Sequence, residues 1–189
     1  MPIVSVSGHA RKVGKTSITE GLITALPEYD WTALKVSSHR HFGDSAKDCT
    51  VIEETDRGGG NDTSRFLKAG ARRAFWIQAE RIEAAAADVR AIIKNAPYVV
   101  IEGNSALDFI AADFSILVLN QGVAEFKKSA RGILSRADAL VLIRESAENM
   151  EWENLLESAP KNTPRFETGN PGIFPPALAE LLRYRLRKS

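Results

Sequence analysis

The sequence contains little cysteine and no excess of either charge. One of its 189 residues is a cysteine, Cys49, so an internal disulfide is excluded and a disulfide-stabilised secreted fold is not expected. The 25 Lys and Arg residues balance 24 Asp and Glu residues, which leaves no overall field that would attract nucleic acid or a membrane surface. We therefore expect neither nucleic acid nor a membrane as a partner.

Long hydrophobic runs are missing as well. Nowhere do about 18 apolar residues follow one another, which is roughly what a membrane-spanning helix needs. The first residues lack a basic region followed by an apolar stretch, the pattern of a secretory signal peptide. These absences predict a cytoplasmic protein. Its length suits a single domain, residues 1–189, in which residues 163–189 form a C-terminal extension.

Short apolar runs alternate with helical patterns along the chain. The predicted strands cover residues 2–7, 31–37, 74–78, 98–101, 114–119 and 139–143. The predicted helices cover residues 17–26, 63–69, 80–95, 124–136 and 150–158. Continuous apolar strands joined by helices are typical of a parallel sheet that is covered on both faces. The predicted fold class is therefore α/β, a three-layer α/β/α domain with a mostly parallel sheet.

Two segments fall outside this alternation. Residues 39–62 are rich in glycine and charge, which predicts a long loop near the mouth of the sheet. His39, His41 and Cys49 lie in this segment, and a metal site is one interpretation of them. Structural zinc needs four closely spaced ligands, which favours anion contacts or loop anchoring for the two histidines. The tail predicts an edge strand near residues 163–167 and a final helix at 175–189.

The segment GHARKVGKTS, Gly8 to Ser17, joins the first predicted strand to the first predicted helix. A glycine-containing loop in this place can surround a phosphate chain with backbone N–H groups and direct a helix N-terminus at it. Five residues separate Gly8 from Gly14, one more than in the usual phosphate-binding pattern. The strand–loop–helix context favours a nucleoside-phosphate site over an ordinary strand-to-helix turn. The predicted contacts are Gly8, His9, Lys12, Val13, Gly14, Lys15, Thr16 and Ser17.

A loop of this kind assigns roles to individual side chains. Lys15 would bridge the terminal phosphates, and the Thr16 hydroxyl would be a ligand of Mg²⁺. Glu102 follows the strand at 98–101, and α/β proteins bind ligands at the carboxyl ends of their strands. It would be the second ligand of the ion; the alternative is a glutamate that faces solvent or caps a helix. Asp62 heads a predicted helix, where aspartate is a favoured N-cap, and Arg65 would form a salt bridge or reach the ligand.

The identity of the nucleotide base stays open. Many proteins that bind GTP carry an Asn-Lys-x-Asp segment after a late strand, but here the strand at 139–143 continues into Arg144-Glu145-Ser146. Asn120 and Gln121, which follow the preceding strand, are no full substitute for that segment. Both GTP and ATP are compatible with the sequence.

Four patches of the sequence carry a family resemblance. They are the loop at 8–17, Leu34-Lys35 followed by His39-Arg40-His41-Phe42, Asp62-Thr63-Ser64-Arg65 with Ala69-Gly70-Ala71, and Val100-Ile101-Glu102-Gly103. These patches resemble the MobB family of molybdopterin-guanine dinucleotide biosynthesis adapter proteins, a P-loop NTPase family in the group that also contains dethiobiotin synthetase and nitrogenase iron protein. Together they span roughly the first 105 residues.

The resemblance implies a GTP-binding protein that hydrolyses GTP slowly with Mg²⁺, forms a homodimer and assists a molybdenum-cofactor nucleotidyltransferase. It implies that Thr16 and Glu102 contact the metal, and that Lys15, Glu102 and Asp62 belong to the catalytic cleft, with Arg65 bordering it. The spacing of the loop glycines and the Glu102-Gly103 strand end are closer to dethiobiotin synthetase. A second hypothesis is therefore an ATP-dependent ligase or kinase that acts on a small carboxylate, and a third is a scaffold with a vestigial loop.

Overall fold

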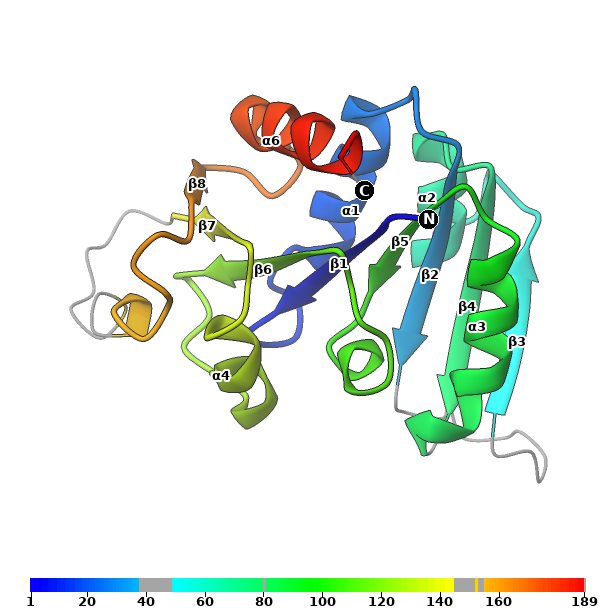
Figure 1. The fold of residues 1–189 in the computed structure, drawn as a ribbon, viewed down its shortest axis with the longest axis horizontal. Coiled ribbons are helices and arrows are strands. Elements are labelled where there is room, and N and C mark those ends of the chain that lie inside the picture. Colours follow the sequence, from blue (N-terminus) through cyan, green and yellow to red (C-terminus); the bar gives the residue numbers. More distant parts are fainter. Residues whose placement is uncertain (38–48, 80, 145–151, 153–154, 189) are drawn as a thin grey trace.

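An eight-stranded sheet forms the centre of the molecule (Figure 1). The computed structural model describes residues 1–37, 49–79, 81–144, 152 and 155–188. The strand order is β3-β4-β2-β5-β1-β6-β7-β8, and every neighbouring pair is parallel except β3 and β4. The strands are β1 (Ile3–Gly8), β2 (Trp31–Ser37), β3 (Cys49–Glu54), β4 (Arg73–Ala79), β5 (Tyr98–Glu102), β6 (Phe114–Asn120), β7 (Ala139–Ile143) and β8 (Arg165–Thr168).

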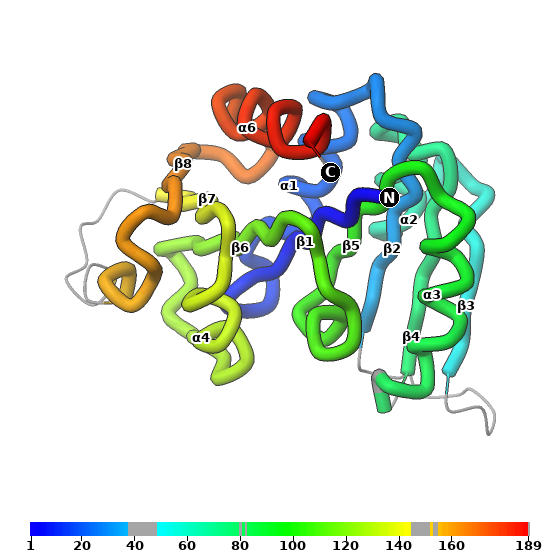
Figure 2. Tube along the Cα trace, viewed as in Figure 1, coloured from blue at the N-terminus to red at the C-terminus, as the bar shows by residue number. Residues whose placement is uncertain are grey.

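Helices cover both faces of this sheet, as Figures 1 and 2 show. Those on one face are α1 (Lys15–Ala25), α2 (Asp62–Ala69) and α6 (Pro176–Leu186). Those on the other face are α3 (Ala86–Lys94), α4 (Lys128–Leu134) and the short 3₁₀ helices η1 (Ile82–Ala85) and η2 (Ser105–Asp108). The predicted three-layer α/β/α fold with a mostly parallel sheet is confirmed.

The local sequence explains why β1 and α1 stand beside each other. Val4 and Val6 of β1 are fully buried on the face that α1 covers, and Ile18 and Leu22 of α1 meet that face one helical turn apart. Burying each such side chain stabilises the fold by roughly 1.5–3 kcal/mol. The loop between the two elements is therefore held at both ends by the hydrophobic core.

The structure corrects the prediction of a continuous loop at residues 39–62. Cys49–Glu54 form β3, an edge strand antiparallel to β4, and Arg73 Nε lies 2.7 Å from Glu53 Oε1 across the pair. Val51 and Ile52 are 36% and 45% exposed, so the strand has no buried apolar face that its sequence could reveal. Its backbone hydrogen bonds to β4 define it instead. His39 and His41 lie outside the described residues.

The tail of the chain belongs to the same sheet and core. The predicted edge strand is β8, which is parallel to β7, and the predicted final helix is α6, which packs against α1. Arg183 of α6 donates hydrogen bonds to Glu28 and to the carbonyl of Ala25, at the end of α1. The predicted helix at 124–136 is shorter, as α4, and the one at 150–158 lies largely outside the described residues. In the part of the chain that the structure describes, no helix has the length and apolar character needed to cross a membrane.

Candidate functional site

The loop between β1 and α1 has the backbone geometry of a tight turn into a helix N-terminus. Lys12 and Gly14 have positive φ angles of 57° and 94°, and Gly14 caps α1. A Cβ atom at Gly8 would lie 2.6 Å from the Val13 side chain, and one at Gly14 would lie 2.7 Å from Pro171. Glycine is therefore required at both ends of the loop. The wider spacing between Gly8 and Gly14 is compatible with a compact loop.

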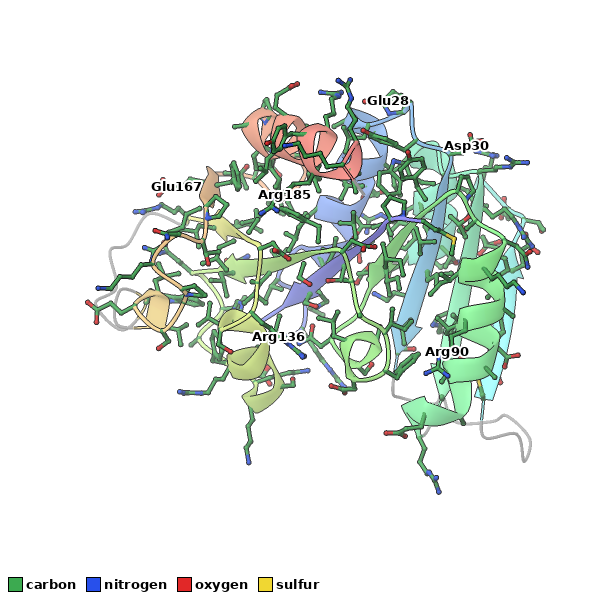
Figure 3. The ribbon with its side chains drawn as sticks, in the orientation of Figure 1. Glu28, Asp30, Arg90, Arg136, Glu167 and Arg185 are labelled. Carbon is green, nitrogen blue, oxygen red and sulfur yellow. The ribbon has the colours of Figure 1, made fainter. Side chains whose placement is uncertain are left out.

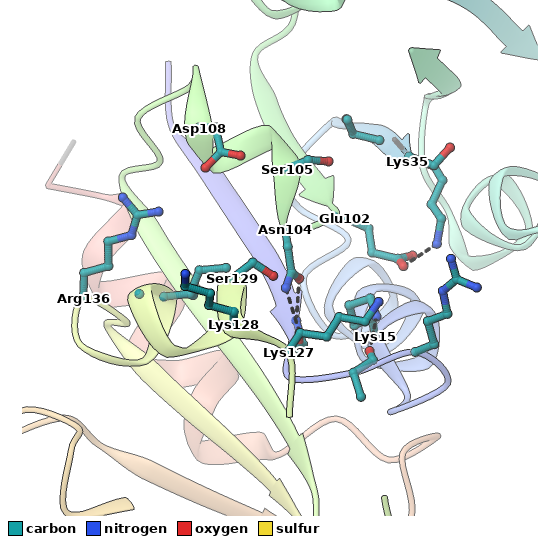
Figure 4. Close-up of a pocket in the computed structure, with 18 residues that line it drawn as sticks. Lys15, Lys35, Glu102, Asn104, Ser105, Asp108, Lys127, Lys128, Ser129 and Arg136 are labelled. Carbon is teal, nitrogen blue, oxygen red and sulfur yellow. Dashed lines mark hydrogen bonds and ion pairs between the residues drawn. The ribbon is translucent and has the colours of Figure 1, made fainter. Parts of the chain in front are cut away.

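Asn104, just beyond the end of the neighbouring strand β5, holds the start of this loop by two hydrogen bonds. Its side-chain oxygen accepts a hydrogen bond from the Gly8 N–H (3.0 Å), and its side-chain nitrogen donates one to the Gly8 carbonyl (2.9 Å) (Figure 4). The sequence analysis missed this residue. Its position two residues beyond Glu102, at the carboxyl end of a central strand, is the signal that points to it.

Lys15 is folded over the loop. Its Nζ atom donates a hydrogen bond to the Ala10 carbonyl (3.0 Å) (Figure 4). Lys15 also borders the cavity along the loop. Burial lowers the pKa of Lys15, and the nearby negative charge of Glu102 opposes that shift. The ammonium group therefore lies at the start of α1 in a partly desolvated place. An anionic ligand bound there would stabilise its positive charge.

Thr16, Lys35, Asp62 and Glu102 form one connected network beside the loop. Thr16 Oγ1 donates a hydrogen bond to Glu102 Oε2 at 3.0 Å, and Lys35 Nζ donates one to Glu102 Oε1. Lys35 Nζ also lies 2.8 Å from Asp62 Oδ2. The Glu102 side chain is 1% exposed, which excludes the alternative of a solvent-facing glutamate. The predicted residues Thr16, Glu102 and Asp62 thus lie in one network, in which Thr16 contacts Glu102 and Lys35 joins Glu102 to Asp62. The sequence analysis had assigned no role to Lys35.

The charges in this network compensate one another. Burial opposes the charge on Lys35, but Glu102 and Asp62 outweigh it, so the pKa of Lys35 is raised. Burial likewise opposes the charge on Asp62, but the hydrogen bond and the charge of Lys35, together with Thr16 and Arg65, outweigh it and lower the pKa of Asp62. Gly103, whose φ angle is 140°, allows the β2 backbone to come close to the end of β5 at Val36. The sequence signal that points to Lys35 is its position as a charged residue within the otherwise apolar run 33–36.

The N-terminus of α2 leaves the Asp62 side chain available to this network. The residue that caps α2 is Asn61, whose side chain accepts a hydrogen bond from the Ser64 N–H (2.8 Å), so Asp62 is not the N-cap. Arg65, one turn later, donates to Glu20 of α1 and to the Ser17 hydroxyl (3.3 Å). Arg65 therefore joins α2 to α1 through a salt bridge with Glu20, and reaches the end of the loop through its hydrogen bond to Ser17.

The His9 side chain does not face the loop cavity. Its Nε2 atom lies 3.0 Å from the Val123 carbonyl and its Nδ1 atom 3.4 Å from the Val118 carbonyl. The ring stacks on Phe126 and meets the edge of Trp152, and burial lowers the pKa of His9. The His9 N–H also bonds to the Val118 carbonyl. These contacts speak against the phosphate contact predicted for His9, because its polar groups are directed into the core.

Two cavities border Lys15. One, of about 510 Å³, lies along the loop and is called the cradle here. It is bordered by residues 11–17 and by Lys35, Asp62, Arg65, Glu102, Asn120 and Pro171. The other, of about 590 Å³, lies between η2 and α4 (Figure 4). Arg11, Lys15, Lys35 and Glu102 border both spaces, so two ligands bound in them would be neighbours.

The cradle offers oxygen ligands that suit a hard divalent cation. Two carboxylates, Glu102 and Asp62, already converge on one cationic group, the Lys35 ammonium, and the Thr16 hydroxyl adjoins Glu102. Among the described residues, no group of three His, Cys, Asp or Glu could hold a metal ion by itself. This donor set fits Mg²⁺, which commonly binds through one or two carboxylates together with phosphate oxygens and water.

Cys49 begins β3 and is half-buried, and burial raises the pKa of its thiol. A raised thiol pKa disfavours the thiolate that a metal site or a nucleophile needs. The interpretation of Cys49 as a metal ligand with His39 and His41 falls partly outside the described residues, because both histidines do.

Comparison with known proteins identifies the fold. No protein-family model matches the chain, and no curated protein matches it in sequence. The structure of LpxK from Aquifex aeolicus in complex with ATP has a TM-score of 0.51 and 19% identity over 88% of this chain, which spans about half (53%) of the LpxK chain. MinD from Aquifex aeolicus has a TM-score of 0.53 and 16% identity, with 100% of this chain and 98% of MinD covered. A MobB homologue from Bacillus stearothermophilus, fully covered, has a TM-score of 0.48 and 14% identity. From the likeness to LpxK and MinD, this chain has the α/β/α fold of P-loop NTPases.

Proposed function

We propose that this protein binds a nucleoside triphosphate together with Mg²⁺ in the cradle and hydrolyses it slowly. The observation that carries the proposal is the placement of Lys15 and Thr16 at the first turn of α1, with the Thr16 hydroxyl bonded to the buried Glu102. A helix N-terminus, a lysine and a hydroxyl–carboxylate pair are the groups that a Mg²⁺–triphosphate requires. LpxK, which shares this fold, was solved in complex with ATP.

Each group of the cradle has a role in this proposal. The N–H groups at the start of α1 hold the phosphate chain, and Lys15 leaves the Ala10 carbonyl to pair with the terminal phosphate. Thr16, Glu102 and Asp62 would hold the metal ion, which when bound would neutralise charge on the phosphate oxygens. Lys35 lowers the pKa of Asp62 and forms an ion pair with Glu102. Water then displaces the nucleoside diphosphate from the terminal phosphoryl group, and inorganic phosphate is released.

The finer proposal is that the nucleotide is GTP and that hydrolysis serves an accessory function in molybdenum-cofactor biosynthesis. It rests on the four MobB-like sequence patches, each of which contributes residues to the cradle: the loop, Lys35 of the second patch, the segment at 62–65 and the strand end at 100–103. The protein would act as a homodimer on a nucleotidyltransferase that attaches a nucleotide to molybdopterin. Turnover would then be slow and would depend on the partner.

Calorimetric titration tests the nucleotide site. Purified protein is titrated with GTP and ATP analogues that resist hydrolysis, each with and without Mg²⁺. We expect Mg²⁺-dependent binding that Lys15→Ala weakens about 10- to 100-fold, because a charge-assisted contact to phosphate is lost. Lys94→Ala, on the exposed side of α3, is the matched control. Unchanged affinity in a folded Lys15→Ala protein would rule out the site.

A second candidate function is ATP-dependent transfer of a phosphoryl group to a small molecule, as in a kinase or a ligase resembling dethiobiotin synthetase. The observation that favours it is the second cavity, which shares Lys15 with the cradle and has room for another ligand. Preference for ATP in the titration, and turnover that requires an added small acid, would support this function. Preference for GTP and turnover without such an acid would support the first.

A further inference from the structure

The second cavity lies where the hydrophobic core of one sheet face is divided. On that face, α3 and the 3₁₀ helices cover β2, β4 and β5, whereas α4 covers β6 and β7. β1 runs between the two clusters. Its Val4 and Val6 side chains point toward the opposite face, and Ser5 and Ser7 alternate with them along the strand. Figure 1 shows α3 and α4 standing apart on either side of β1. The cavity opens at the carboxyl end of this break, between η2 and α4.

The wall formed by α4 and the residues at its two ends carries three cations. Lys127, Lys128 and Arg136 all border the cavity and are separated from η2 by it (Figure 4). Across the described ranges, none of these three side chains is in an ion pair or a hydrogen bond, whereas Lys35 in the same cavity is fully engaged by Glu102 and Asp62. Cations left unpaired in a concave site are groups that an anionic ligand can satisfy.

The opposite wall, formed by η2, has a different character. Ser105 and Asp108 face the cavity from this side, and Asn104 lies at its base, where it holds Gly8 (Figure 4). A hydroxyl group and a carboxylate accept hydrogen bonds from the hydroxyl or amino groups of a ligand. The cavity is thus asymmetric, with one wall for an anion and one for a neutral or amino-bearing polar group.

We propose that this cavity binds a second small molecule that bears a phosphate group and at least one hydroxyl or amino group. Lys127, Lys128 and Arg136 hold the phosphate, and Ser105 and Asp108 accept hydrogen bonds from the other end. Three cations on one wall suit a dianionic phosphate better than a monoanionic carboxylate. The inference rests on the proposed function, because a ligand here adjoins the nucleotide phosphates through Lys15.

Amide NMR spectroscopy of the full chain tests the proposal with inorganic phosphate as the probe and acetate as the carboxylate comparison. The cradle is first saturated with Mg²⁺ and the non-hydrolysable nucleotide, and each anion is then titrated at constant ionic strength. We expect saturable shifts of the amides at 105–108 and 127–136 with phosphate and none with acetate. Lys128→Gln and Arg136→Gln should each weaken phosphate binding about tenfold, one charge-assisted contact being worth roughly 1.4 kcal/mol.

The matched control is Arg90→Gln, on α3 and away from the cavity (Figure 3). It should leave the phosphate titration unchanged. The proposal would be overturned if phosphate caused no saturable shifts at these amides. It would also be overturned if Lys128→Gln and Arg136→Gln bound phosphate as tightly as the wild type does, or if acetate bound as tightly as phosphate. Nucleotide binding is scored separately on the same samples. If the nucleotide fails to bind, the phosphate titration is performed with Mg²⁺ alone, so that loss of the cradle and loss of the second site give different results.

Discussion

Lys35 is a charged residue within a buried strand, and two carboxylates compensate its burial. Because its pKa is raised in the folded protein, its stabilising contribution is present below the unfolded pKa and is lost as pH rises through the folded pKa. At neutral pH, Lys35 therefore serves as the counter-ion of Glu102 in the absence of another cation.

We predict that Lys35→Met lowers the free energy of unfolding by about 3 kcal/mol at pH 7, because Glu102 is left buried with an uncompensated charge. Mg²⁺ should restore part of this loss, since a cation bound by Glu102 and Asp62 stabilises only the folded state. Urea denaturation with and without Mg²⁺ measures both effects. Lys68→Met, exposed on α2, is the control and should change little. Equal Mg²⁺ responses of the variant and the wild type would contradict the assignment of the metal ligands.

At the scale of elements, the connection from β3 to α2 is organised by Glu54. Its carboxylate accepts hydrogen bonds from the Asp56 N–H (2.9 Å), from the Asn61 side chain (2.8 Å) and from the Thr63 hydroxyl (3.2 Å). These contacts, with that of the Asp56 N–H the largest, lower the pKa of Glu54 to about 2. They also hold the first turn of α2, where Asp62 meets Lys35.

This geometry predicts an acid-dependent loss of stability. The contribution of Glu54 is present above its unfolded pKa of 4.5 and is lost as pH falls toward about 2. Glu54→Gln should therefore show a smaller fall in unfolding free energy between these pH values than the wild type does. Chemical denaturation across this range measures the difference, with Glu157→Gln, an exposed residue near β8, as the control. Parallel curves for the wild type and Glu54→Gln would show that the Glu54 contacts contribute nothing in solution.

At the scale of the whole molecule, the tail supports the element that carries the loop. Phe174 packs so closely on α1 that a Cβ atom at Gly21 would lie 2.7 Å from it, and Leu178 and Leu182 of α6 are fully buried in the shared core. Phe174 and α6 are thus packed against α1, the helix that carries Lys15 and Thr16.

We predict that Leu182→Ala destabilises the entire protein by about 2–5 kcal/mol in a single cooperative transition, because it opens a cavity in a core that α1 and α6 share. Circular dichroism and tryptophan fluorescence should report the same midpoint during urea denaturation. Leu181→Ala, at a partly buried position of the same helix, should cost less. Two separated transitions would instead mean that residues 163–189 fold independently of the rest.

Some features of the fold and the site depend on interactions between neighbouring residues, and others depend on interactions between residues far apart in the sequence. Only the first kind can be predicted from the sequence. The alternation of strands and helices, and the loop from Gly8 to Ser17, are encoded by neighbouring residues, so the sequence alone predicted the layers and the placement of Lys15 and Thr16. Glu102 was found because the carboxyl ends of parallel strands share one edge.

Only the tertiary structure decided the features that depend on distant pairings. β3 forms because its backbone pairs with that of β4. The side chains of β3 are too exposed to give the apolar pattern that predicts a strand. His9 turns into the core because the ends of β6 and the following loop present carbonyls to its ring. Lys35 meets Glu102 across 67 positions of sequence, and Asn104 meets Gly8 across 96. Sequence patterns record the periodicity of single elements, whereas these contacts arise only when the sheet brings separate elements together.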